Sequence, residues 1–189
     1  MKITRPIRAV LFDMDGVMVD SEFVYMKYLL EFAKEKNPAV KMEDINPMVG
    51  RSRQDSWTVM EQAVNNGGNW ETLIREWADR DIYSQIDYRK IFRPEMKTTV
   101  QELKRRGYIV ALVSSTGPKL ISRIVEEVGM RPEFDLIVSG KQFKQSKPNP
   151  EIYHYTANIL GVREDECFVV EDSTVGIEAA YRAGMSIAG

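Results

Sequence analysis

Short apolar runs recur along the chain, at 10–12, 108–113, 136–138 and 167–170, and a fifth run at 185–188 is interrupted only by Ser186. Apolar runs that do not alternate with polar residues indicate strands buried on both faces. Helix start and stop signals follow, and they predict helices over 94–106, 119–128, 150–160 and 173–183. Strands that alternate with helices in this way predict an α/β fold with a Rossmann-like parallel sheet covered on both faces.

A helical block interrupts this alternation directly after the first run. Apolar residues recur at helical spacing over 22–36, and Asn37-Pro38 ends that helix. Ser52 followed by Asp55 resembles a capping box that opens a second helix through Val64.

A third helix is predicted from Trp70 to about Ile91, and no strand is predicted in the block. We therefore expect an α/β catalytic core of residues 1–19 and 92–189, with an all-helical cap domain of residues 20–91 inserted after the first strand. Such a cap would lie over the carboxyl end of that strand, where open α/β sheets bind ligands.

The segment VLFDMDGVMVDS, residues 10–21, carries the strongest candidate chemistry. Val10 to Phe12 read as a buried strand that ends in Asp13 and Asp15. Two carboxylates at this spacing repel each other unless a cation binds them or one is protonated, so a hard divalent ion such as Mg²⁺ is expected. The alternative is a simple turn after a strand, since Asp-Gly is common turn chemistry.

The pattern DxDGxxxDS after an apolar strand resembles the haloacid dehalogenase superfamily, and the longer run resembles its β-phosphoglucomutase-like phosphatase and mutase branch. The resemblance implies that Asp13 attacks phosphorus and that Asp15 is the general acid and base. It also implies a helical cap hinged near Asp20-Ser21.

Three further motifs match this family at the ends of later strands. Ser114 would bind a phosphoryl oxygen, and Lys147 in SKPNPEIY would hold Asp13 ionised. Glu171 and Asp172 would coordinate or position Mg²⁺ together with Asp13 and the Asp15 carbonyl. Each has an ordinary reading when taken alone: a loop serine, a solvated lysine before proline, and acidic residues at a helix start.

Substrate binding is expected from the cap and from the loop after the second strand. Residues 50–56, GRSRQDS, resemble the cap segment in which the branch carries an arginine for a distal phosphate, which makes Gly50 and Arg53 candidates. Ser115 adds a hydroxyl beside Ser114. Two features depart from the β-phosphoglucomutases: Tyr25 replaces a histidine, and no Lys-Asn pair follows Ser114.

These departures favour water as the phosphoryl acceptor. We expect a Mg²⁺-dependent phosphatase of small phosphorylated metabolites, sugar phosphates above all, working through an aspartyl-phosphate intermediate. A β-phosphoglucomutase is the alternative. A non-catalytic phospho-acceptor domain is disfavoured by Asp15 and by the helical insertion, and Asp15 also argues against dehalogenation.

Composition excludes several other classes. Lys+Arg number 26 against 28 Asp+Glu with no basic tract, so nucleic acid is not an expected partner. No apolar run approaches the roughly 20 residues of a membrane span, and no signal peptide is recognised, so we expect a cytoplasmic protein. The single cysteine, Cys167, is expected to be buried, and His154 is the one histidine.

The last predicted strand ends at Ala188-Gly189, whereas the family resemblance implies a further helix after it. An uncovered parallel edge invites association. We therefore expect either a longer native product or a partner subunit on this edge, and the oligomeric state stays open.

Overall fold

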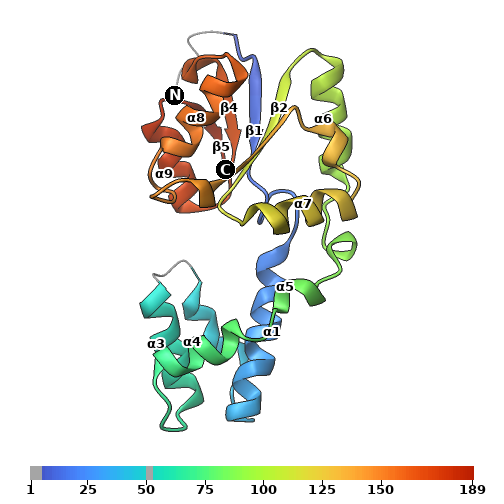
Figure 1. The fold of residues 1–189 in the computed structure, drawn as a ribbon. Coiled ribbons are helices and arrows are strands. Elements are labelled where there is room, and N and C mark those ends of the chain that lie inside the picture. Colours follow the sequence, from blue (N-terminus) through green and yellow to red (C-terminus); the bar gives the residue numbers. More distant parts are fainter. Residues whose placement is uncertain (1–5, 50–52) are drawn as a thin grey trace. The chain divides into compact units, whose positions relative to one another are not determined.

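A computed structural model describes residues 6–49 and 53–189, with the side chain of Arg53 also outside the described part (Figure 1). The chain forms two compact units, one of Met1–Asp20 and Asp87–Gly189 and one of Ser21–Ile86. The candidate residue Gly50 and the Arg53 side chain therefore lie outside the described residues.

The first unit is built on a five-stranded sheet in the order β3-β2-β1-β4-β5, with every neighbouring pair parallel. Its strands are β1 (Ala9–Phe12), β2 (Ile109–Ser114), β3 (Leu136–Ser139), β4 (Cys167–Val170) and β5 (Ser186–Ala188). Its α-helices are α6 (Glu95–Arg105), α7 (Pro118–Glu127), α8 (Glu151–Leu160) and α9 (Thr174–Arg182). Short 3₁₀ turns lie at η2 (Tyr88–Lys90), η3 (Arg131–Glu133), η4 (Gly140–Gln142) and η5 (Glu164–Glu166). The predicted parallel α/β sheet is confirmed.

Helices cover both faces of this sheet, α8 and α9 on one and α6 and α7 on the other (Figure 1). Successive strand residues point to opposite faces, so Leu11 and Val169 pack under α8 and α9 while Val10 and Phe12 point away. Each fully buried Leu or Val contributes roughly 1.5–3 kcal/mol to stability. Cys167 is buried in the same core, as its apolar neighbours predict.

The topology brings chemistry-bearing segments together at one edge of the sheet. Because all strands run in the same direction, the loops after β1, β2 and β4 leave from the same edge. The strand order reverses between β1 and β4, which is the point where open α/β sheets bind ligands. Asp13 follows β1 directly, and its N–H donates to the carbonyl of Val170, the last residue of β4, at 2.9 Å.

The described residues of the second unit form helices joined by loops, with no strand: α1 (Ser21–Lys36), α2 (Met42–Ile45), η1 (Asn46–Met48), α3 (Arg53–Val64), α4 (Trp70–Ala78) and α5 (Ile82–Gln85). It has a core of its own, in which Phe32 packs edge-on against Trp57 and Trp77. Among the described residues, no helix is long and apolar enough to cross a membrane.

The predicted third helix begins at Trp70 as expected, but its predicted end at about Ile91 is wrong. α4 ends at Ala78, and Asp81 has φ 43°, a left-handed conformation that an α-helix cannot contain. The compact helical unit accordingly ends at Ile86, before the predicted boundary at residue 91. The short elements α2 and η1 were not predicted either, since pieces of three or four residues carry too little periodicity to recognise.

Candidate active site

Asp13 is the buried carboxylate at the tip of β1, with 7% of its surface exposed. Its Oδ1 accepts a hydrogen bond of 2.7 Å from Nζ of Lys147. Burial raises the pKa of Asp13 to about 7; the Lys147 charge opposes this, and the negative charges of Glu171 and Asp15 add to it. The protonation state of Asp13 therefore depends on the positive charge that lies beside it.

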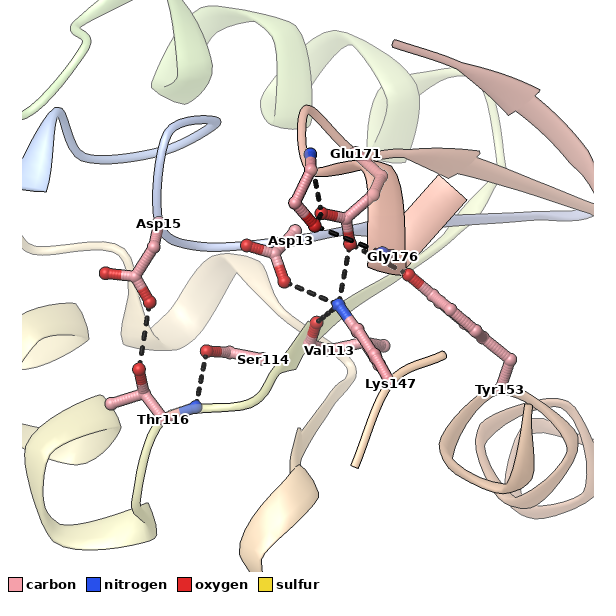
Figure 2. Close-up of polar contacts among 10 residues, drawn as sticks. Asp13, Asp15, Val113, Ser114, Thr116, Lys147, Tyr153, Glu171 and Gly176 are labelled. Atoms are coloured by element: carbon pink, nitrogen blue, oxygen red, sulfur yellow. Dashed lines mark hydrogen bonds and ion pairs between the residues drawn. The ribbon is translucent and has the colours of Figure 1, made fainter. Parts of the chain in front are cut away.

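Lys147 is the positive centre of the site (Figure 2). Its ammonium group donates to Asp13 at 2.7 Å, to Glu171 Oε2 at 2.6 Å and to the carbonyl of Val113 at 3.2 Å. These three acceptors use all three of its protons. Burial lowers the pKa of Lys147, but the negative charges of Asp13 and Glu171 outweigh burial and raise it, so the group stays protonated.

Glu171 is enclosed by protein donors on both oxygens. Oε2 accepts from Lys147 and, at 3.1 Å, from the Tyr153 hydroxyl; Oε1 accepts from the Ser173 hydroxyl at 2.7 Å and from its N–H at 3.2 Å. Burial raises the pKa of Glu171, but Lys147 and Ser173 together hold it below its usual value. This arrangement makes Glu171 the anchor of Lys147.

Tyr153 and Ser173 were missed by the sequence reasoning. Tyr153 lies on α8, where the sequence predicted a helix over 150–160, and it is fully buried. A buried tyrosine hydroxyl almost always has a hydrogen-bond partner, so a tyrosine on the core face of a helix close after Lys147 was the available signal. Ser173 caps α9 by accepting from the N–H of Gly176 at 3.1 Å.

Two glycines leave room for the acidic side chains. At Gly16, where φ is +80°, a Cβ would overlap the carboxylate of Asp172. At Gly176 in the first turn of α9, a Cβ would overlap the carboxylate of Glu171. Both positions need glycine because a carboxylate lies against the backbone, and Gly16 needs it also for its left-handed conformation.

Asp15 and Ser114 are linked through Thr116. The Thr116 hydroxyl donates to Asp15 Oδ2 at 2.9 Å, and the Thr116 N–H donates to Ser114 Oγ at 3.0 Å. Figure 2 shows Asp15 pointing toward Thr116, whereas Asp13 points toward Lys147. The two aspartates that the sequence places two residues apart therefore have different partners. Thr116 was not singled out from the sequence.

The acidic side chains have the chemistry of a hard-cation site. Within the described residues, oxygens of Asp13, Glu171 and Asp172 lie within 4.8 Å of one another. Since Glu171 already accepts from protein donors on both oxygens, Asp13 and Asp172 are the better ligands. Partial desolvation, with the charges of Glu171 and Asp15, raises the pKa of the exposed Asp172, although a backbone hydrogen bond and the charge of Arg93 oppose the rise. Such crowding of negative charge fits a divalent cation.

Among the substrate-binding candidates, Ser115 is the one whose side chain the structure describes. Ser115 is exposed beside the buried Ser114. In the helical unit, the hydroxyl of Tyr25 accepts from Trp77 Nε1 at 2.9 Å, and the Tyr25 ring packs edge-on against that indole. Arg80 forms a bidentate pair with Glu35, at 2.8 and 2.6 Å.

Comparison with known proteins identifies relatives along the whole chain. A family model described as haloacid dehalogenase-like hydrolase matches residues 10–189. A phosphorylated carbohydrates phosphatase from Thermotoga maritima is 26% identical over 95% of this chain and 82% of its own length. A phosphoglycolate phosphatase from Aquifex aeolicus is 27% identical over 96% of this chain and 84% of its own length.

A solved structure is also similar. A protein from Thermotoga maritima, described as a "putative beta-phosphoglucomutase", has a TM-score of 0.79 at 26% identity. The match covers 97% of this chain and 85% of that one.

Proposed function

The chain belongs to the haloacid dehalogenase-like hydrolase family, and from this premise we propose that it is a phosphatase of small phosphorylated metabolites, with sugar phosphates as the substrate class. The family and its phosphatase and phosphomutase relatives make the protein an enzyme that acts on phosphate esters. We propose further that the reaction is hydrolysis, with water as the phosphoryl acceptor, and that it passes through an aspartyl-phosphate intermediate.

The observation that carries this proposal is the contact between Lys147 and Asp13. A buried carboxylate bound on Oδ1 by an ammonium group has one oxygen held in place, and its other oxygen, Oδ2, is the one we assign to attack on phosphorus. The same ammonium group adds positive charge where the phosphoryl group would bind, which stabilises the charge of the transition state.

The reaction then has two steps. In the first, a bond forms between Asp13 and phosphorus while the bond from phosphorus to the ester oxygen breaks, and Asp15 gives its proton to that oxygen. In the second, Asp15 takes a proton from water as the water oxygen attacks phosphorus, and the bond to Asp13 breaks. Ser114 is assigned to a phosphoryl oxygen.

We assign a divalent cation, Mg²⁺ in the family, to Asp13, Asp172 and the backbone carbonyl of Asp15. When bound, it supplies positive charge to the phosphoryl oxygens. Glu171 supports the site through Lys147.

Hydrolysis is favoured over sugar-phosphate isomerisation because a mutase must grip a second phosphate. Tyr25 stands where a histidine would, and its hydroxyl already accepts from Trp77. Arg80, one cation of the helical unit, is paired with Glu35. Each charged hydrogen bond that is missing costs about 1.5–3 kcal/mol, and two can shift partitioning toward water by roughly a hundredfold or more. The mutase is the second candidate because of the structural similarity above.

A panel of phosphomonoesters with Mg²⁺ tests the proposal, including β-glucose 1-phosphate with a trace of the bisphosphate. Inorganic phosphate and glucose 6-phosphate are followed in the same reaction. We expect phosphate release to exceed isomerisation, and we expect Asp13→Asn, an almost isosteric change, to abolish both. Isomerisation that outruns phosphate release would make the protein a mutase; phosphate released by Asp13→Asn at the wild-type rate would remove the nucleophile assignment.

A further inference from the structure

Thr116 makes a contact that neither the family resemblance nor the sequence pattern assigns. Its hydroxyl donates to Oδ2 of Asp15 at 2.9 Å, across 101 positions of sequence (Figure 2). Threonine has only one hydroxyl proton, so that proton is committed to Asp15 in this arrangement.

Thr116 is itself held from two sides. Its N–H donates to the fully buried Ser114 at 3.0 Å, and its carbonyl accepts from the Ser139 hydroxyl at 2.6 Å. Ser114 and Ser139 are the last residues of β2 and β3, and they are paired in the sheet register. The donor that reaches Asp15 is therefore fixed to the ends of two neighbouring strands, which limits its freedom before any substrate binds.

We propose that Thr116 is a positioning residue for Asp15, and this inference rests on the proposed phosphatase function. A hydroxyl that donates to Oδ2 requires this oxygen to be an acceptor in both protonation states of the carboxyl group. The proton of the acid form is then carried on Oδ1. Oδ1 gives that proton to the departing ester oxygen in the first step and takes one from water in the second.

The alternative is that the Thr116 hydroxyl only stabilises the loop after β2. The two roles predict different losses of rate for substrates with different leaving groups when the hydroxyl is removed. A poor leaving group such as a sugar alkoxide needs the proton from Asp15, whereas p-nitrophenolate leaves without one. A damaged loop would instead weaken phosphate binding through Ser114 and slow the first step for both substrates.

The test compares Thr116→Val, which removes the hydroxyl at nearly constant shape, with Thr116→Ser, which keeps it. Rapid-mixing experiments measure release of the leaving group in the first turnover from a hexose phosphate and from p-nitrophenyl phosphate, and inorganic phosphate is titrated as an inhibitor. Thr98→Val serves as the control, because Thr98 lies on the exposed face of α6. Thr116→Ala is a second hydroxyl-free variant in case Thr116→Val does not fold.

We expect Thr116→Val to slow the first step by roughly tenfold or more with the hexose phosphate. We expect a loss of less than about threefold with p-nitrophenyl phosphate, an unchanged phosphate inhibition constant, and near wild-type rates for Thr116→Ser. Equal losses on both substrates, weaker phosphate inhibition, or hexose phosphate turnover within twofold of wild type would overturn the positioning role. A wild-type enzyme that hydrolyses no phosphomonoester would instead overturn the proposed function, and the role of Thr116 with it.

Discussion

At the scale of single residues, the site is a buried cluster in which one positive charge compensates two negative charges. Asp13 and Glu171 share the one ammonium group of Lys147, and all three side chains are less than a tenth exposed. Removal of one partner from such a buried pair costs about 3–5 kcal/mol, because it leaves the other charge without compensation. Tyr153 and Ser173, which donate to Glu171, therefore help to hold Lys147 in position.

Tyr153→Phe tests the contribution of the hydrogen bond from Tyr153 to Glu171. The change removes one hydrogen bond to the charged Glu171 without creating a cavity, so we expect the free energy of unfolding to fall by about 1.5–3 kcal/mol. Turnover should fall only modestly, since Lys147 keeps its contacts with both acids. Urea unfolding and steady-state kinetics measure the two effects.

Tyr155→Phe is the matched control on the same helix, because Tyr155 is 40% exposed. It should leave both quantities close to wild type. Equal stabilities of the Tyr153 and Tyr155 variants would show that the bond to Glu171 adds nothing.

Asp172→Ala tests the assignment of the cation ligands. Loss of a carboxylate ligand should raise the Mg²⁺ concentration for half-maximal activity by at least about tenfold, with activity largely recovered at high Mg²⁺. Activity is titrated against Mg²⁺ for both proteins. A titration midpoint equal to that of wild type would remove Asp172 from the ligand set.

The sequence predicts residues such as Asp13 and Lys147 because they follow apolar strands or carry a motif. It does not predict their supporting donors. Tyr153 meets Glu171 across 18 positions and Thr116 meets Asp15 across 101, and such pairs form only when the strands have been assembled. Ordinary tyrosine and threonine residues carry no local sign of these contacts.

At the scale of elements, the first turn of α9 lies so close to Glu171, the residue after β4, that a Cβ at Gly176 would overlap its carboxylate. Gly176→Ala should push that carboxylate away from Lys147. Overpacking of this kind costs about 1–3 kcal/mol, partly offset by the roughly 1 kcal/mol by which alanine favours a helix. We expect a small loss of stability but a loss of turnover of about tenfold or more, measured by unfolding and kinetics.

Gly117→Ala provides the comparison. Gly117 precedes α7 with φ −68°, and a Cβ there would meet no atom within 4 Å. Its effect should be confined to a small loss of stability from the helix start. A Gly176 variant as active as the Gly117 variant would show that the Glu171 carboxylate can shift without consequence.

The elements of the sheet unit were predictable because each has a clear boundary signal. Gly107, Gly129 and Gly161, which end α6, α7 and α8, all have positive φ. The segment after Trp70 lacked such a signal. α4 ends at Ala78, and Asp81 then adopts a left-handed conformation, which aspartate tolerates but which an aspartate in the sequence does not predict. Asp79, Arg80 and Asp81 read equally well as a polar helical face.

At the scale of the whole molecule, the two compact units have separate hydrophobic cores. The core of the sheet unit includes Met185, the core of the helical unit includes Met60, and both side chains are fully buried. The three tryptophans, Trp57, Trp70 and Trp77, all belong to the helical unit. Tryptophan fluorescence therefore reports the unfolding of that unit, whereas amide hydrogen exchange can follow peptides of each unit separately.

Two units with separate cores need not unfold in a single transition, so matched changes in each should act locally. Met60→Ala and Met185→Ala each remove a buried methionine, at a cost of about 2–5 kcal/mol. We expect Met60→Ala to lower the urea midpoint of tryptophan fluorescence and to speed exchange in residues 21–86. Met185→Ala should leave that midpoint nearly unchanged and speed exchange in β4, β5 and α9. If both variants lowered the fluorescence midpoint equally and raised exchange across the whole chain, the two cores would form a single cooperative unit.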